Sequence, residues 1–157
     1  MATKKISELT AASALTGVEL IELVQGGASK QGTLSAILAK APVIVQLACS
    51  DLTTALSAAL SRGYFRAPKA FTLTAVRASL LTASESGGVT IDINKNGTTV
   101  LSTKLTIDEG EKTSTTAAVP AVISVTSIAD DDEITIDIDN GGDGAAGLVL
   151  TLIGTPA

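Results

Sequence analysis

The stretch VTIDINKNGTTVLS, residues Val89–Ser102, carries the pattern that decides the fold. Its first half alternates apolar and polar residues, which is the two-residue period of a strand with one buried face. Asn96-Gly97 follows, and this dipeptide favours a tight hairpin turn because both residues readily adopt positive φ. The stretch therefore predicts two antiparallel strands, Val89–Asn94 and Thr98–Ser102.

The same alternation recurs towards the C-terminus. EITIDID (Glu133–Asp139) has an apolar face and a wet face, whereas LVLTLIG (Leu148–Gly154) is mostly apolar on both faces. A two-sided apolar strand indicates either a central strand or a strand sealed at a subunit interface. The residues of that second interpretation are Leu148, Val149, Leu150, Leu152 and Ile153.

The rest of the C-terminal part contains further short strand patterns separated by turn residues. Such regular spacing predicts a mainly β fold, a jelly-roll-like antiparallel β-sandwich over residues 41–157. The segment Asp51–Arg62 is ambiguous, because three leucines recur at a helical spacing of four while two threonines disfavour a helix. The other predicted strands are Val43–Ala48, Tyr64–Ala67, Ala70–Leu81, Leu105–Asp108 and Ala121–Ile128.

Residues 1–40 have a different pattern of apolar and polar residues, which predicts a small N-terminal segment with a helix and a hairpin. Gly26-Gly27 supplies the turn of a hairpin, and a two-stranded hairpin is marginal in water by itself. We therefore expect this segment to be stabilised against another surface. The predicted elements are a helix at Ile6–Ala12, strands at Glu19–Val24 and Lys30–Leu34, and a helix at Leu34–Lys40.

The composition excludes several classes of function. The chain has no histidine and one cysteine, Cys49, which excludes a histidine-based catalytic triad and makes a tetrahedral zinc site untenable. A net charge of −5 with scattered Lys and Arg disfavours nucleic acid as a partner. No apolar run reaches the ~20 residues that cross a bilayer, and the N-terminus lacks the pattern of a secretory signal. We expect a soluble protein, made in a cytoplasm, with no cofactor and no membrane partner.

Two acidic patterns resemble calcium sites, and both have a simpler interpretation. DINKNG at Asp92–Gly97 begins like a calcium loop, but its twelfth position is Thr103 instead of an acid, so a hairpin is favoured. The run Asp130–Glu133, followed by further acids, is typical of a solvated turn that discourages edge-to-edge strand pairing. We therefore predict no metal site. The further acids are Asp137, Asp139 and Asp143.

Two other sets of charged residues are candidates for a functional role. Four carboxylates are candidates for a glycoside-hydrolysing pair, yet nothing fixes their separation and the chain has few aromatic platforms for sugars, so we predict no enzyme. Four basic residues are candidates for pairing with the Asp130–Glu133 run of an adjacent copy, although scattered surface charge is the favoured interpretation. The carboxylates are Glu85, Asp108, Glu109 and Glu111; the basic residues are Arg62, Arg66, Lys69 and Arg77.

The N-terminal sequence segments KISEL, ALTGVELIELVQGG and KQGTLS resemble a short module found near the N-terminus of many tailed-phage tail-fibre and other virion proteins. The resemblance spans about Lys4–Ala39 and implies attachment to a virion partner. The attachment residues that it implies are Ile6, Leu9, Leu20, Ile21, Leu23, Leu34 and Leu38.

The downstream words ACSDLTTAL, FRAPKAFTLTAVRASLLTA, DDDEITIDID and LVLTLIG resemble a β-domain recurrent in structural proteins of phages. This second resemblance implies a virion component made in the host cytoplasm. We expect a homotrimeric capsid decoration protein or short head fibre that binds the particle through its N-terminus, with the trimer inferred from the resemblance and from the two-sided apolar strand at Leu148–Ile153. The alternative is a tail-associated fibre, adaptor or receptor-recognition protein. Nothing in the sequence supports a host-glycan site.

Overall fold

The computed structural model describes residues 16–157, and the helix predicted at Ile6–Ala12 lies outside them. The chain divides into two compact units, Met1–Ala41 and Pro42–Ala157. This division falls one residue from the boundary predicted on composition. We call the units the hairpin unit and the β-domain.

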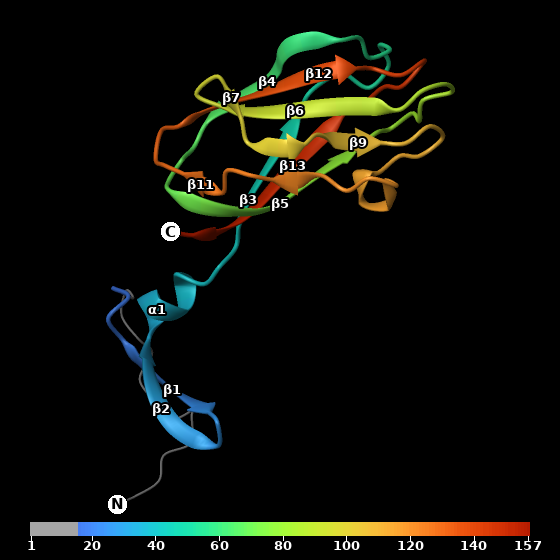
Figure 1. The fold of residues 1–157 in the computed structure, drawn as a ribbon. Coiled ribbons are helices and arrows are strands. Elements are labelled where there is room, and N and C mark those ends of the chain that lie inside the picture. Colours follow the sequence, from blue (N-terminus) through green and yellow to red (C-terminus); the bar gives the residue numbers. More distant parts are fainter. Residues whose placement is uncertain (1–15) are drawn as a thin grey trace, which may run out of the picture. The chain divides into compact units, whose positions relative to one another are not determined.

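The hairpin unit contains strand β1 (Leu20–Gln25), strand β2 (Ala28–Thr33) and helix α1 (Leu34–Leu38). β1 and β2 pair antiparallel in a continuous register, and the predicted Gly26-Gly27 turn joins them with φ of 60° and 77°. The side chain of Thr33 caps α1 by accepting a hydrogen bond from the Ala36 amide at 3.1 Å. The predicted hairpin and short helix are therefore confirmed (Figure 1).

The β-domain contains two antiparallel sheets and a minor two-stranded one (Figure 1). One sheet has the strand order β11-β5-β13-β3, and we call it the β3 sheet. The other has the order β4-β12-β6-β7 with β9 also pairing with β6, and we call it the β12 sheet; β8 and β10 form the minor pair. The strands are β3 (Val43–Ala48), β4 (Ala59–Arg66), β5 (Phe71–Ser79), β6 (Val89–Lys95), β7 (Thr98–Thr99), β8 (Leu101–Thr103), β9 (Leu105–Ile107), β10 (Val122–Ile123), β11 (Ser127–Ile128), β12 (Glu133–Asn140) and β13 (Val149–Pro156).

One apolar core lies between the two main sheets. It is built from the alternate residues that the sequence pattern assigns to the inner face, because successive side chains of a strand point to opposite faces. The prediction of a mainly β, sandwich-like chain with antiparallel sheets is thus confirmed. The most completely buried side chains are Phe71, Leu73, Ile91, Ile93, Ile107, Ile128, Ile134, Ile136, Ile138, Leu148, Leu150 and Leu152.

The ambiguous segment Asp51–Arg62 forms no helix. Asp51 follows the end of β3, and its carboxylate accepts the amides of Thr54 and Thr53 at 2.6 and 2.8 Å, which lowers its pKa to about 2. Of the leucines at helical spacing, only Leu56 is buried. The chain then enters β4 at Ala59, five residues earlier than the predicted Tyr64, so the spacing of four reflects no amphipathic helix.

Two predicted strands are each interrupted. Thr98–Ser102 is divided into β7 and β8 at Val100, whose side chain is buried in the core. Ala121–Ile128 is divided into β10 and β11, because Ser124 and Val125 turn to bond the Val100 carbonyl through their amides. The Asn96-Gly97 turn is confirmed, with φ of 49° and 79°.

Candidate attachment and assembly surfaces

The hairpin unit leaves large apolar side chains exposed. Of the attachment residues implied by the resemblance, Leu20, Ile21 and Leu38 are exposed, whereas Leu23 and Leu34 are partly covered. Leu20 and Leu38 keep 63% and 61% of their area in solvent. Exposed large apolar side chains gathered in one small unit are typical of an interaction surface. Ile6 and Leu9 lie outside the described residues. We call the exposed set the hairpin surface: Val18, Leu20, Ile21, Val24, Ile37 and Leu38.

The two faces of the hairpin differ. On one face Leu23 lies over Gly32, where an added Cβ would come within 3.2 Å of the Leu23 Cδ2 atom. On the other face Leu20 and Val24 flank Glu22, and all three are exposed. The second face is therefore available to a partner, while Leu23 has a local packing role.

The Glu19 carboxylate organises the start of the hairpin unit, and sequence reasoning missed it. Its Oε1 atom accepts the Thr16 amide at 2.7 Å, and its Oε2 atom accepts the Gly17 amide at 2.8 Å. These bonds lower the pKa of Glu19 to about 2, with the Thr16 amide as the largest cause. The Glu19 and Gly17 carbonyls accept the Leu34 and Ser35 amides, so the segment is tied to the start of α1. The sequence feature that could have revealed this role is Thr16-Gly17 followed two residues later by the acid Glu19.

The structure corrects the predicted subunit interface on β13. Leu148, Leu150 and Leu152 are buried in the core of the β-domain itself, because β13 lies between β3 and β5 with its even-numbered residues facing inward. Their apolar character is explained by a central strand. Val149 and Ile153 point to the outer face and are partly exposed, so these two alone remain available for contacts between copies.

The outer faces of the two main sheets differ in charge. On the β3 sheet, Ile44 lies beside Ile153 and Ala48 beside Val149, with uncharged Gln46 between them. On the β12 sheet, Asp92 lies opposite Asp137. The outer face of the β12 sheet thus carries acids, whereas the outer face of the β3 sheet is largely apolar and carries Arg77 beside Thr151.

The ion cluster on the β12 sheet is bonded internally. The ammonium of Lys104 lies 3.1 Å from Asp92 Oδ2 and 2.5 Å from Asp139 Oδ2. Asp137 accepts the Ser61 amide at 2.6 Å and the Asn94 side-chain amide at 2.9 Å. Asp92, predicted to face water, is 7% exposed because Lys104 and the Thr99 hydroxyl cover it.

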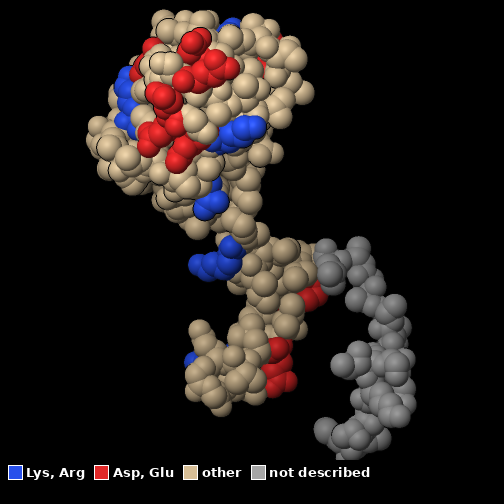
Figure 2. Space-filling model, turned by 90° about the vertical axis from the view of Figure 1, so that its right-hand side faces the viewer, with Lys and Arg blue, Asp and Glu red and all other residues tan. Residues whose placement is uncertain are grey.

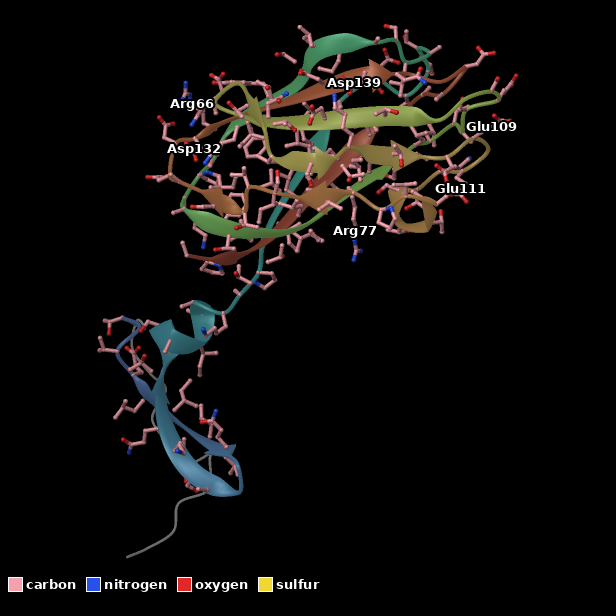
Figure 3. The ribbon with its side chains drawn as sticks, viewed as in Figure 1. Arg66, Arg77, Glu109, Glu111, Asp132 and Asp139 are labelled. Carbon is pink, nitrogen blue, oxygen red and sulfur yellow. The ribbon has the colours of Figure 1, made fainter. Side chains whose placement is uncertain are left out.

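The acidic turn Asp130–Glu133 bonds within its own chain. Arg66 approaches Asp131 and Glu133 of the same chain at 3.3 and 3.4 Å, in agreement with the favoured interpretation of surface charge. Asp132 accepts the Ala129 amide at 2.7 Å and the Asn96 side-chain amide at 2.7 Å; both bonds, the amide first, hold the pKa of Asp132 below its usual range. Figure 3 shows Arg66 and Asp132 at one end of the β-domain.

The four carboxylates that are candidates for a glycoside-hydrolysing pair lie in loops. Figure 3 places Glu109 and Glu111 together at the end of the β-domain opposite to Arg66 and Asp132. Figure 2 shows acidic side chains gathered on the side of Glu109 and Glu111. Glu109 accepts the Gly87 amide at 3.0 Å, Asp108 accepts the Ala118 amide at 2.8 Å, and Glu111 accepts the Thr116 hydroxyl. Glu85 is exposed. These bonds hold loop backbones in place, which is a structural role.

A shallow groove of about 510 Å³ runs between β5 and the segment that includes β10. Its lining includes the apolar Leu105, Val122 and Ile123 and the hydroxyls of Thr74 and Thr115. Arg77 contributes the one charge of the lining. The groove therefore has the composition of a weak contact site and none of the acids of a hydrolytic site.

Cys49 is buried, and burial raises the pKa of its thiol to about 11. It packs as a small apolar side chain, as expected of a structural cysteine. Among residues 16–157, no group of three or more His, Cys, Asp or Glu side chains is placed to hold a metal ion. In that same range, the helices are too short to cross a membrane.

No protein-family model, curated protein or solved structure matches the chain.

Proposed function

We propose that the chain is a structural component of a phage virion, attached to the particle by its hairpin unit and projecting its β-domain. The observation that carries the proposal is the hairpin surface, whose Leu20 and Leu38 stay exposed although the unit is rich in apolar residues. The resemblance of residues 4–39 to a virion attachment module supplies the partner class. Within that class, we propose a capsid decoration protein or short head fibre.

We also infer that the β-domain wraps as a jelly roll. The strand orders β11-β5-β13-β3 and β4-β12-β6 with β9 support this, because successive strands cross from one sheet to the other except between β6 and β9. Two sheets joined by such crossings are expected of the eight-stranded jelly roll. The strands in this count are β3, β4, β5, β6, β9, β11, β12 and β13.

The homotrimer implied by the resemblance stays a proposal. Of the residues predicted for its interface, Val149 and Ile153 support it, since both face outward on the β3 sheet beside the apolar Ala48 and Ile44. A threefold contact there would bury the outer face of that sheet.

The alternative function is a tail-associated fibre, adaptor or glycan-binding receptor-recognition protein. The groove beside β5 is the feature that favours it, because Thr74, Ser114 and Thr115 offer hydroxyls beside Arg77. A glycan array probed with the full chain tests this alternative. Binding that is lost on Arg77→Ala would support the alternative, and the absence of binding to every glycan on the array would contradict it.

The attachment proposal is tested by binding to phage particles assembled without this chain. In the double variant Leu20→Ser with Leu38→Ser, we expect loss of co-sedimentation with the particles and an unchanged melting temperature of the β-domain. The matched control replaces two exposed leucines of the β-domain, Leu60→Ser with Leu81→Ser, and should bind like the unmodified chain. Unchanged binding of the first variant would contradict attachment through the hairpin surface.

A further inference from the structure

The strand β3 has a free edge. It is the last strand of the order β11-β5-β13-β3, and its register with β13 is continuous over its whole length. The Cys49 amide donates to the Leu148 carbonyl at 2.8 Å, so odd-numbered residues of this strand bond to β13. Because backbone groups alternate in direction along a strand, the amides and carbonyls of Ile44, Gln46 and Ala48 point to the opposite side. Among the described residues, no backbone hydrogen bond reaches them there.

The other sheet edges of the β-domain carry devices that prevent strand addition. β4 has Arg62 and Arg66, a register shift against β12, and Ser61 at a φ of 52°. β7 and β11 are two residues long, and β9 is three. Charge, bulges and short length are the usual protections of an edge strand. β3 has none of them, since VIVQLA is six residues long, uncharged and regular.

The inner face of β3 is also incompletely covered. Val45 and Leu47 point towards the core, as Val43 and Cys49 do, yet they are only partly buried. They therefore offer apolar area next to the unpaired backbone groups. A strand added at this edge would satisfy the backbone groups and cover these side chains together.

The sequence of β3 is complementary to itself. In an antiparallel pair of two β3 strands centred on Gln46, Gln46 faces Gln46, Ile44 faces Ala48, and Val45 faces Leu47. The positions with free backbone groups fall opposite one another, as a hydrogen-bonded ladder requires. No charges are opposed. The β-domain of each copy has one such edge, so a two-fold pair leaves neither of the two exposed.

We propose that two copies of this chain associate through the edge of β3, with the β3 strands antiparallel about Gln46 and the two β3 sheets continuous across the pair. This contact goes beyond the proposed function, because it rests on the strand edge and not on the hairpin surface. It is isologous and closes as a dimer, which separates it from the threefold assembly implied by the resemblance.

The first test measures amide hydrogen exchange by NMR together with the mass of the full chain in solution. The amides of Val45 and Leu47 bond to β13 and serve as an internal control. We expect a dimer mass and slow exchange at Ile44, Gln46 and Ala48, comparable to the control amides. Fast exchange at those three amides or a monomer mass would each overturn the proposal, and a trimer mass would overturn it in favour of the alternative threefold contact on the outer face of the β3 sheet.

The second test uses opposite charges at the centre of the pair. Gln46→Lys places two ammonium groups opposite each other, and Gln46→Glu does the same with carboxylates, so each variant should weaken the dimer by about tenfold or more. Mixing the two variants should restore it as a mixed dimer. The matched control is Thr151→Lys, which adds the same charge on the neighbouring central strand and should leave the dimer intact.

The two variants separate the edge from the face of the sheet. Loss of association on Thr151→Lys and retention on Gln46→Lys would assign the contact to the outer face and overturn the edge proposal. Failure of the mixture to recover association would also overturn it, because that recovery requires Gln46 to face Gln46. Binding to phage particles, measured on the same variants, reports the proposed function independently.

Discussion

The hairpin unit and the β-domain use apolar residues for opposite purposes. In the β-domain, the alternating isoleucines of β6 and β12 are completely withdrawn from solvent between two sheets. In the hairpin unit, Leu20, Val24 and Leu38 remain largely exposed. The β-domain thus buries its own apolar face, whereas the hairpin unit leaves apolar area exposed, which supports the proposed attachment to a partner.

The difference shows that apolar content alone does not define a core. A core needs a second layer to receive the apolar face, and the β-domain has two sheets that provide one for each other. A single hairpin with a five-residue helix has no such layer. Stability of the chain and attachment of the chain are therefore expected to respond to different substitutions.

The largest expected effect separates the two units by stability. Ile136→Ala removes a side chain with 0% exposure from the centre of β12 and should lower the free energy of unfolding of the β-domain by about 2 to 5 kcal/mol. Leu20→Ala, the matched control in the hairpin unit, should change it by less than about 0.5 kcal/mol. Chemical denaturation of the full chain measures both. Equal losses would refute the division into two kinds of apolar residue.

The next effect concerns tight packing within the β-domain. A Cβ atom at Gly63 would come within 2.6 Å of Leu47 Cδ2 and 3.1 Å of Ile136 Cγ1. Gly63→Ala should therefore destabilise the β-domain by about 1 to 3 kcal/mol through overpacking. Denaturant midpoints check the value. A neutral result would mean that β3 and β4 are less closely packed than the structure shows.

A smaller effect is expected at the acidic turn. Arg66→Ala removes two ion pairs whose side chains are largely exposed, so it should lower the melting temperature only slightly, and less at high salt. Melting temperatures at two ionic strengths check this. A large, salt-independent loss would give Arg66 a packing role instead.

The smallest global effect is expected at Glu19. Its folded pKa of about 2 lies below the ordinary value of 4.5, so its contribution is present above pH 4.5 and is lost as the pH falls towards 2. Glu19→Gln should speed amide exchange at Thr16 and Gly17 while leaving the β-domain unchanged. NMR titration of the carboxyl carbon checks the pKa, and an ordinary value would mean that the Thr16 and Gly17 bonds do not form.

Much of the β-domain could be predicted from the sequence because its inner and outer positions differ in polarity. β6 and β12 alternate strictly, and Asn96-Gly97 fixes the turn after β6. The glycine pair of the hairpin was equally informative. Each of these signals lies within a few neighbouring residues, and such signals are sufficient to predict individual strands and tight turns.

The errors arose where tertiary packing decides the outcome. Leu52, Leu56 and Leu60 have a helical spacing, but only Leu56 has a core position available to it. The apolar residues of β13 suited an interface or a centre, and only the strand order shows that Leu148, Leu150 and Leu152 belong to the centre. The free edge of β3 likewise becomes visible only when the neighbours of every strand are known.

Amide hydrogen exchange on the isolated full chain is the most direct test of the division between the two units. The amides of Ile21 and Leu23 bond across the hairpin, and those within β12 bond in the centre of its sheet. We predict that the hairpin amides exchange at least about a hundredfold faster than the β12 amides, because only the latter require global unfolding. Equal protection of the two sets would contradict the claim that the hairpin unit depends on a partner.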